Sequence, residues 1–174
     1  MRVIAGDLGG RRLHAPKGEE IRPTSDRVRE ALFSILGDIE GLTVLDLYCG
    51  TGAVAIEAIS RGAAAATLVD TQVAAAERNV EELGIGDRCT LARMDALRFL
   101  ERDFGEYDLV FSDPPYKLAP RLGPDLDRLL GPRLAKGARV IAESAAGAPL
   151  EIGLPLLDER RYGSTMIRIH GGPA

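Results

Sequence analysis

From Leu42 onward, short runs of apolar residues alternate with longer stretches in which apolar residues recur at helical spacing. The short runs predict buried strands and the longer stretches predict helices, and their alternation indicates an α/β fold with a mostly parallel sheet. The tail holds further strand-like runs around Gly163, which predict a closing antiparallel hairpin. The predicted strands are Thr43–Leu47, Ala66–Asp70, Cys89–Arg93, Tyr107–Phe111, Arg139–Glu143 and a pair within Leu156–His170, and the predicted helices are Ala53–Arg61, Gln72–Leu83, Ala96–Glu101 and Leu122–Leu134.

The N-terminal segment follows a different pattern. Residues 2–13 form short β-prone runs around Gly9-Gly10 with arginines on both arms, which predicts a small basic hairpin. Apolar residues at helical spacing then predict a helix from Asp26 to Leu36, with Ser25 placed to cap it. The hairpin and the charged helix face are as consistent with plain solvation as with a partner.

Composition limits the classes of protein to consider. At 174 residues with 45% hydrophobic residues, the chain is long enough for one buried core, so we predict a single domain, 1–174, in which residues 1–37 extend a core of residues 38–174. The only cysteines, Cys49 and Cys89, indicate neither a disulfide framework nor a zinc ribbon. No apolar run approaches the ~18 residues that span a bilayer. We therefore expect a monomer in the reducing cytoplasm, without metal or membrane contact.

Charge is unevenly distributed along the chain. The formal net charge is -4, which argues against a protein that holds nucleic acid by bulk electrostatics. Residues 1–36, however, contain seven Arg or Lys against five acidic side chains, a net charge of +2 that leaves -6 for the remainder. Any RNA contact is therefore expected near the N-terminus.

The most distinctive stretch is Asp113-Pro114-Pro115-Tyr116, at the end of a predicted strand. Prolines fix φ and supply carbonyls, so a stiff turn is a sensible interpretation. The same rigidity fits a binding function, because a carboxylate beside a fixed carbonyl provides acceptors for both hydrogens of an amino group, and a tyrosine ring provides a stacking face. This interpretation predicts a site for an exocyclic amine on a flat ring.

The first core strand runs into a glycine loop, Gly50-Thr51-Gly52, followed by a helix. With Ala55 the loop also satisfies the dinucleotide pattern, and Asp70 lies at the distance expected for a ribose contact, so an NAD(P)-binding module stays an alternative. Asp46, just before the loop, favours a cationic ligand without phosphate, such as S-adenosylmethionine. Asp95 and the Ala96 N–H are candidates for adenine contacts, although an acid in the position of Asp95 is more often a helix cap.

Together these motifs resemble those of the bacterial RsmD-type small-subunit rRNA guanine-N2 methyltransferases. The resemblance rests most specifically on the segment from Arg22 to Phe33, which begins Arg-Pro-Thr-Ser-Asp-Arg-Val-Arg-Glu. It departs from the family pattern at Asp70, where Glu is usual, and at Cys49, where Ala is usual. The other stretches that carry the resemblance are Asp46–Gly52, Asp95–Leu100, Asp113–Tyr116 and Tyr162–Thr165.

The resemblance implies a Rossmann-like class I methyltransferase fold with the N-terminal hairpin and helix as an extension. It implies S-adenosylmethionine-dependent methylation of N2 of a guanine in 16S rRNA, guanine 966, within the 30S subunit. An adenine-N6 methyltransferase would use the same site, but no segment is long enough to be a separate target-recognition domain. The implied cofactor contacts are Asp46, Tyr48, Gly50, Gly52, Asp70, Asp95 and Ala96; the catalytic residues are Asp113, Pro114, Pro115 and Tyr116; and the candidate RNA contacts are Arg11, Arg12, Arg22, Arg27 and Arg29.

Overall fold

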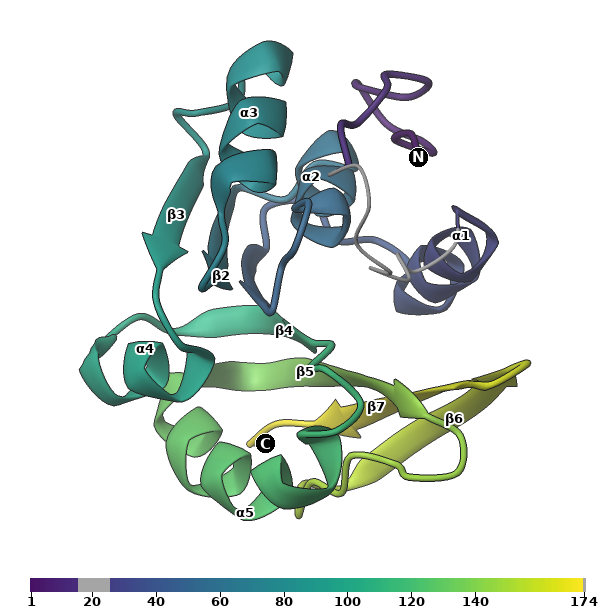
Figure 1. The fold of residues 1–174 in the computed structure, drawn as a ribbon, viewed down its shortest axis with the longest axis vertical. Coiled ribbons are helices and arrows are strands. Elements are labelled where there is room, and N and C mark those ends of the chain that lie inside the picture. The colour runs from purple at the N-terminus through teal and green to yellow at the C-terminus, as the bar shows by residue number, and fades with distance from the viewer. Residues whose placement is uncertain (16–25, 174) are drawn as a thin grey trace.

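The computed structural model describes residues 1–15 and 26–173. A seven-stranded sheet forms the middle layer (Figure 1), and its strands are parallel except for the closing hairpin. The order across the sheet is β3 (Cys89–Arg93), β2 (Ala65–Asp70), β1 (Thr43–Leu47), β4 (Tyr107–Ser112), β5 (Leu134–Ala145), β7 (Thr165–Gly171) and β6 (Leu156–Tyr162).

Helices cover both faces of the sheet and divide the core in two (Figure 1). On one face α1 and α2 pack apolar side chains such as Phe33 and Ile56 against Leu109 and Phe111. On the other face the apolar side of α5, including Leu126 and Leu130, packs against Leu45 and similar strand residues. The helices are α1 (Asp26–Leu36), α2 (Ala53–Ser60), α3 (Ala74–Leu83), α4 (Ala96–Arg102) and α5 (Ala119–Leu130), followed by the short η1 (Gly131–Arg133).

The predicted α/β architecture and closing hairpin are confirmed, with some different boundaries. Helix α5 begins at Ala119 rather than Leu122, because Pro120 lies in its first turn, where a missing N–H costs nothing, and it ends before Gly131-Pro132. Strand β5 begins at Leu134, within the predicted helix, because Leu134 pairs with Tyr107 of β4. No helix in the described part of the chain is long and apolar enough to cross a membrane.

The predicted N-terminal hairpin is wrong in detail. Residues 2–13 form no regular strands, and a single antiparallel bridge joins Arg2 to Arg12. The segment still doubles back, with the Val3 N–H donating to the Arg11 carbonyl at 2.9 Å. It curls because Gly6 and Gly10 adopt left-handed conformations, with φ of 79° and 83°, which strands do not use. We call residues 1–15 the N-terminal arm.

Candidate active site

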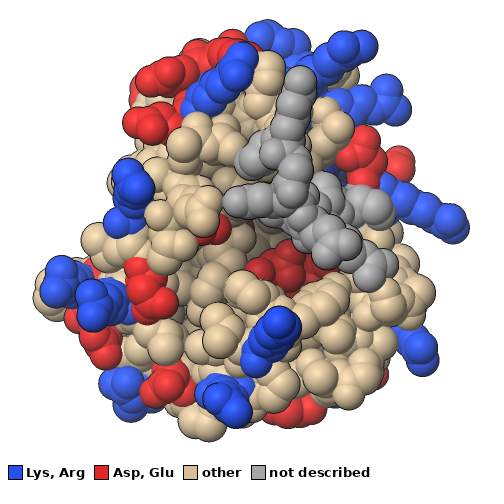
Figure 2. All heavy atoms as spheres, viewed as in Figure 1, with Lys and Arg blue, Asp and Glu red and all other residues tan. Residues whose placement is uncertain are grey.

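The predicted acids lie along the edge of the sheet where the parallel strands end. Strand β1 has β2 on one side and β4 on the other, so the strand order reverses there, and ligands of open α/β sheets bind at such a point. Asp46 lies in β1, Asp70 ends β2, Asp95 follows β3 and Asp113 follows β4. Figure 2 shows acidic side chains inside a hollow near the middle of the molecule.

The glycine loop is a tight turn that leads directly into α2. Gly50 and Gly52 have φ of 52° and 75°, and the Gly52 N–H donates to the Cys49 carbonyl at 2.7 Å. A Cβ on Gly52 would lie 2.7 Å from Leu68 Cδ2, so a side chain at this position has no room. Tyr48 also has a positive φ, 64°, which is rare for a residue with a side chain. The loop is therefore held in a specific, strained shape in the protein itself.

Asp70 and Asp95 both hold backbone amides at the edge of the sheet. Asp70 accepts hydrogen bonds from the Gly50 N–H and the Gln72 N–H, each at 3.0 Å. Asp95 caps α4 by accepting from the N–H groups of Leu97 and Arg98 at 3.0 and 3.1 Å. Asp95 is therefore a helix cap in this structure, and its Oδ1 is the oxygen that forms both cap bonds. Its proposed adenine contact would add to that role.

Asp46 is the most buried of these acids, with 4% of its surface exposed. Its Oδ2 accepts a hydrogen bond from the Ala55 N–H at 3.2 Å. The pKa of Asp46 is raised to about 7, chiefly because of burial; the charge of Asp70 also raises it, and the Ala55 hydrogen bond acts in the opposite direction. A buried carboxylate whose ionisation is this unfavourable is suited to a cationic ligand, which would restore its charge.

The Asp113–Tyr116 turn presents its groups in fixed directions. The Pro115 carbonyl accepts from the Leu118 N–H at 2.8 Å and so belongs to the turn that starts α5. This leaves the carbonyl of the buried Pro114 as the better candidate to accept from a substrate. The Tyr116 hydroxyl lies 3.4 Å from Thr165 Oγ1 on β7, which orients the ring. Burial raises the pKa of Asp113 well above its ordinary value, and the charges of Glu143 and Asp46 add to this.

Glu143 is a site residue that the sequence interpretation missed. It lies on β5 and acts electrostatically on Asp113. The sequence does carry a signal for it, because Glu143 ends the predicted strand Arg139–Glu143 just as Asp70 ends Ala66–Asp70. A pattern limited to aspartates at strand ends does not include it. Among the described residues, no group of His, Cys, Asp and Glu side chains is placed to hold a metal ion.

The proposed RNA-binding arginines differ in their surroundings. Arg11, Arg12 and Arg27 are exposed, and Arg11 donates to the Glu82 carbonyl at 3.2 Å. Arg29 is fully buried, with 0% exposed, so the expectation that it contacts RNA is corrected: in this structure its role is internal. Arg22 lies outside the described residues. Of these three exposed arginines, Arg12 lines a hollow, whose other described lining residues are Met1, Arg2, Gly10, Leu13 and Asp26.

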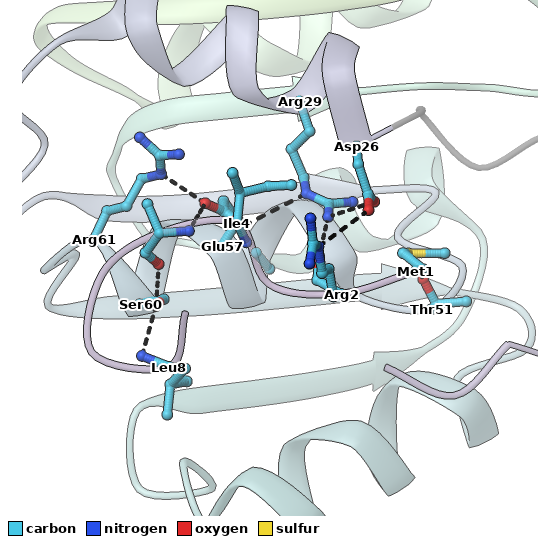
Figure 3. A network of polar contacts seen from close by, with 12 residues as sticks. Met1, Arg2, Ile4, Leu8, Asp26, Arg29, Thr51, Glu57, Ser60 and Arg61 are labelled. Carbon is cyan, nitrogen blue, oxygen red and sulfur yellow. Dashed lines mark hydrogen bonds and ion pairs between the residues drawn. The ribbon is translucent and has the colours of Figure 1, made fainter. Parts of the chain in front are cut away.

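A buried polar network joins the N-terminal arm and α1 to α2 (Figure 3). The Arg29 guanidinium lies 3.6 Å from the Glu57 carboxylate and 3.1 Å from that of Asp26, and it donates to the Arg2 carbonyl. Glu57, also fully buried, accepts from the N–H groups of Ile4 and Ala5 at 2.7 and 3.1 Å. The arm is thus fixed to the helix that begins at the glycine loop.

Asn79 on α3 makes a second connection between the N-terminal arm and the glycine loop. Its side-chain amide donates to the carbonyls of Thr51 and His14 at 2.9 and 3.1 Å. Its oxygen accepts from the His14 N–H at 2.7 Å. The end of the arm and the middle of the glycine loop therefore share one buried side chain, a relation that no local sequence pattern indicates.

The strand order and the acidic, glycine-rich edge define the fold of the class I S-adenosylmethionine-dependent methyltransferases. The family described as "Conserved hypothetical protein 95" matches residues 1–171, and the chain belongs to this family. A solved structure described as "Putative methyltransferase yhhF from Escherichia coli" superposes with a TM-score of 0.86 at 32% identity, covering 100% of this chain and 98% of that one. An RNA methyltransferase from Salinibacter ruber in complex with S-adenosyl-L-homocysteine shares the fold, with a TM-score of 0.66 at 20% identity over 87% of this chain and 94% of that one.

Curated relatives match a shorter stretch. "Ribosomal RNA small subunit methyltransferase D" of Escherichia coli is 36% identical over 120 residues, which cover 67% of this chain and 61% of the relative. "Putative rRNA methyltransferase YlbH" of Bacillus subtilis is 38% identical over 125 residues, covering 67% of each chain. The aligned part thus spans less than two thirds of the length of the first relative.

Proposed function

We propose that this protein transfers the methyl group of S-adenosylmethionine to N2 of a guanine in small-subunit rRNA. The observation that carries the proposal is the position of Asp113-Pro114 at the end of β4, which pairs with β1, the strand that holds the buried Asp46 and leads into the glycine loop. The names of the relatives support rRNA as the substrate. The target that the family resemblance implies is guanine 966 of 16S rRNA.

The residues of the edge fit S-adenosylmethionine. The cofactor supplies an activated methyl group when bound, and it carries cationic ammonium and sulfonium centres. Asp46 is a buried carboxylate whose ionisation is unfavourable, which suits a cation. A Cβ on Gly50 would meet nothing within 4 Å, so this glycine leaves room for a ligand to approach the backbone closely. Asp70 would take the ribose hydroxyls, and Asp95 with the Ala96 N–H would take the adenine. Tyr48 would close the cofactor side of the loop.

The Asp113 turn fits the amine. The lone pair of a guanine amino group is delocalised into the ring, which makes N2 a poor nucleophile. If the Asp113 carboxylate and the Pro114 carbonyl accept its hydrogens, the lone pair localises on N2 and the positive charge that develops there is stabilised. Pro115 stiffens the turn, and Tyr116 would stack on a base that has left its helix. Alignment by these groups supplies the remaining rate acceleration.

The substrate would lie between this turn and the N-terminal arm. Arg11, Arg12 and Arg27 are exposed on the arm and on α1, and Arg22 is retained from the sequence as a candidate. Few cations are available on a chain of net charge -4, so recognition would depend on the shape of the RNA. This favours the assembled 30S subunit, whose proteins hold the target loop open, over free 16S rRNA.

Mapping of N2-methylguanosine in rRNA tests the substrate directly. A strain without this protein should lack the modification at one position of 16S rRNA, and the purified protein should restore it on subunits from that strain. A complete modification pattern in the deletion strain would overturn the assignment of this substrate.

Replacing Asp113 tests the chemistry. Asp113→Ala should slow methyl transfer by ~10²-fold or more, because the lost acceptor acts on the transition state. Asp113→Asn should retain part of the rate, since an amide oxygen still accepts. Single-turnover assays with saturating cofactor measure the step, and titration calorimetry should show nearly unchanged cofactor affinity. Asp87→Ala, an exposed aspartate, is the matched control. A wild-type rate for Asp113→Ala would rule out the amine-acceptor mechanism.

A further inference from the structure

The pairing of β4 with β5 places Glu143 beside Asp113. In this parallel pair Phe111 is opposite Ile141 and Ser112 is opposite Ala142. If this register continues by one residue beyond Ser112 and Ala142, Asp113 lies next to Glu143. Side chains of opposed residues in neighbouring parallel strands point to the same face of the sheet. The register itself therefore brings the two carboxyl groups together.

Asp46 lies on the same face of the sheet, one row earlier. It is opposite Phe111, and Phe111, Ile141 and Val44 all contribute to the core under α1 and α2, so the three acids extend this face to the end of the sheet. Of the charged residues buried under these helices, Arg29 and Glu57 are engaged with each other. On the far side of β5, Glu143 pairs with the apolar Ile167 of β7. Among the described residues, the charges that raise the pKa of Asp113 are those of Glu143 and Asp46.

We propose that Glu143 is a second catalytic carboxylate, and that Asp113 and Glu143 together accept the proton that N2 of the guanine releases on methylation. This inference rests on the proposed function, because it concerns the same amine. In the proposed function Asp113 is the only carboxylate that contacts the amine. The new element is a pair of acids from neighbouring strands that share one proton.

The N2 lone pair forms the new N–C bond as the methyl carbon separates from the sulfur of the cofactor, which keeps the electron pair of the broken bond. N2 then carries a positive charge and both of its original hydrogens. One N–H bond breaks, its electron pair returns to N2, and the proton forms an O–H bond on the Asp113–Glu143 pair. The pair passes from two negative charges to one, so the net charge of the site is conserved.

An acid pair is better suited to this task than a single exposed acid. A proton held between two adjacent carboxylates relieves their mutual repulsion, so the second acid raises the proton affinity of the first. Burial acts in the same direction, and the pKa of Asp113 is accordingly raised. The ammonium-like N2 is then deprotonated within the site, with no need for bulk water to reach it.

The pH dependence of single turnover distinguishes this role from a structural one. With saturating S-adenosylmethionine and 30S subunits, the wild-type rate should fall as pH falls through the pKa of the pair, at a pH above the ordinary carboxyl range near ~4. Glu143→Gln should move this fall to lower pH by about one unit and lower the plateau rate by roughly 10-fold. Glu143→Asp keeps the charge and should keep the position of the fall.

The effect of Glu143 on the titration of Asp113 can also be measured without methyl transfer. Carboxyl ¹³C NMR of the free protein should show Asp113 titrating at lower pH in Glu143→Gln than in wild type. Glu106→Gln, an exposed glutamate just before β4, is the matched control and should leave both profiles unchanged. An unchanged acid limb and an unchanged Asp113 titration in folded Glu143→Gln would overturn the acid pair. A wild-type protein that methylates no rRNA at any pH would instead overturn the proposed function, while the NMR titration would still decide whether the pair exists.

Discussion

The carboxyl group of Asp46 is almost completely removed from solvent, and its pKa is raised to about 7 by burial. The ordinary aspartate pKa is about 4, so folding makes ionisation of this side chain less favourable. An acid whose folded pKa exceeds its unfolded pKa destabilises the fold at pH values above the folded pKa, and this penalty disappears as pH falls to the unfolded pKa. The protein therefore holds a destabilising charge where the proposed cofactor would need it.

Asp46→Asn should separate stability from binding. Urea unfolding at pH 8 should show the variant to be more stable than wild type, because the buried charge is removed while the amide oxygen still accepts from the Ala55 N–H. The difference should shrink between pH 7 and pH 4. Calorimetry should show weaker S-adenosylmethionine binding by ~1 to 3 kcal/mol, the usual loss for a charge-assisted partner. Asp87→Asn serves as the exposed control, and a destabilised Asp46→Asn at pH 8 would contradict the argument.

Among the elements, the N-terminal arm and α1 depend on α2 for their position. Polar contacts contribute to this: Glu57 and Ser60 on α2 accept hydrogen bonds from the backbone of residues 4–8, and Arg29 pairs with Glu57. The fit at Gly6 is close, since a Cβ there would lie 1.7 Å from the Ser60 carbonyl oxygen. Breaking a buried ion pair leaves an unpaired charge, which costs more than the pair contributes.

Glu57→Gln should therefore destabilise the protein by about 3 to 5 kcal/mol and loosen the arm. Hydrogen exchange at the Ile4 and Ala5 amides should become faster, because their acceptor loses its charge and its ion pair. Arg29→Met combined with Glu57→Gln should recover part of the stability, since no buried charge is left unpaired. Glu101→Gln on α4 is the exposed control. If the single variant unfolds at the wild-type urea concentration, the network does not hold the arm.

Local sequence patterns predict most of the helices and strands correctly. The predictions are wrong where a residue's environment is set by a segment that is distant in the sequence. Strands β1 and β3 match their predicted bounds because apolar runs with clear ends mark them. The sequence predicts an RNA contact for Arg29, because a charged helix face is ordinarily solvated. No local pattern indicates that its partner is Glu57, which lies on another helix. Strand β5 was shortened because its first residues pair with β4 only in the assembled sheet. The role of Glu143 at the site can be predicted from its position at the end of a strand. The role of Asn79 cannot, because its partners Thr51 and His14 are distant in the sequence.

For the whole molecule, charge distribution limits how RNA can bind. The net charge is -4, and several surface arginines are already engaged, as Arg78 is with Glu82 and Arg168 with Glu151 and Glu159. Few phosphate contacts remain, so free RNA should bind weakly and with a shallow dependence on salt. Exposed Arg11 and Arg12 on the arm are the cations best placed to contribute.

Charge reversal at Arg11 and Arg12 should raise the apparent KM for 30S subunits. The affinity for S-adenosylmethionine should stay unchanged, because these arginines would contact the RNA and not the cofactor. The matched control reverses Arg102 and Lys136, exposed residues at the opposite edge of the sheet, and should have little effect. Methylation assays at several salt concentrations measure both. Efficient methylation of protein-free 16S rRNA at physiological salt, or an unchanged KM, would count against recognition by the arm and the assembled subunit.

The sheet order also has a consequence for synthesis on the ribosome. The central strand β1 pairs with β4, and the acids of the site extend from Asp46 to Glu143 along the chain. The arm and α1 leave the exit tunnel shortly before α2, on which they dock, so this part of the chain has its polar partners close in sequence. The catalytic edge has to wait for β4 and β5, roughly 5 to 20 s later at ordinary elongation rates. A nascent chain would therefore present its arm long before it could carry out any chemistry.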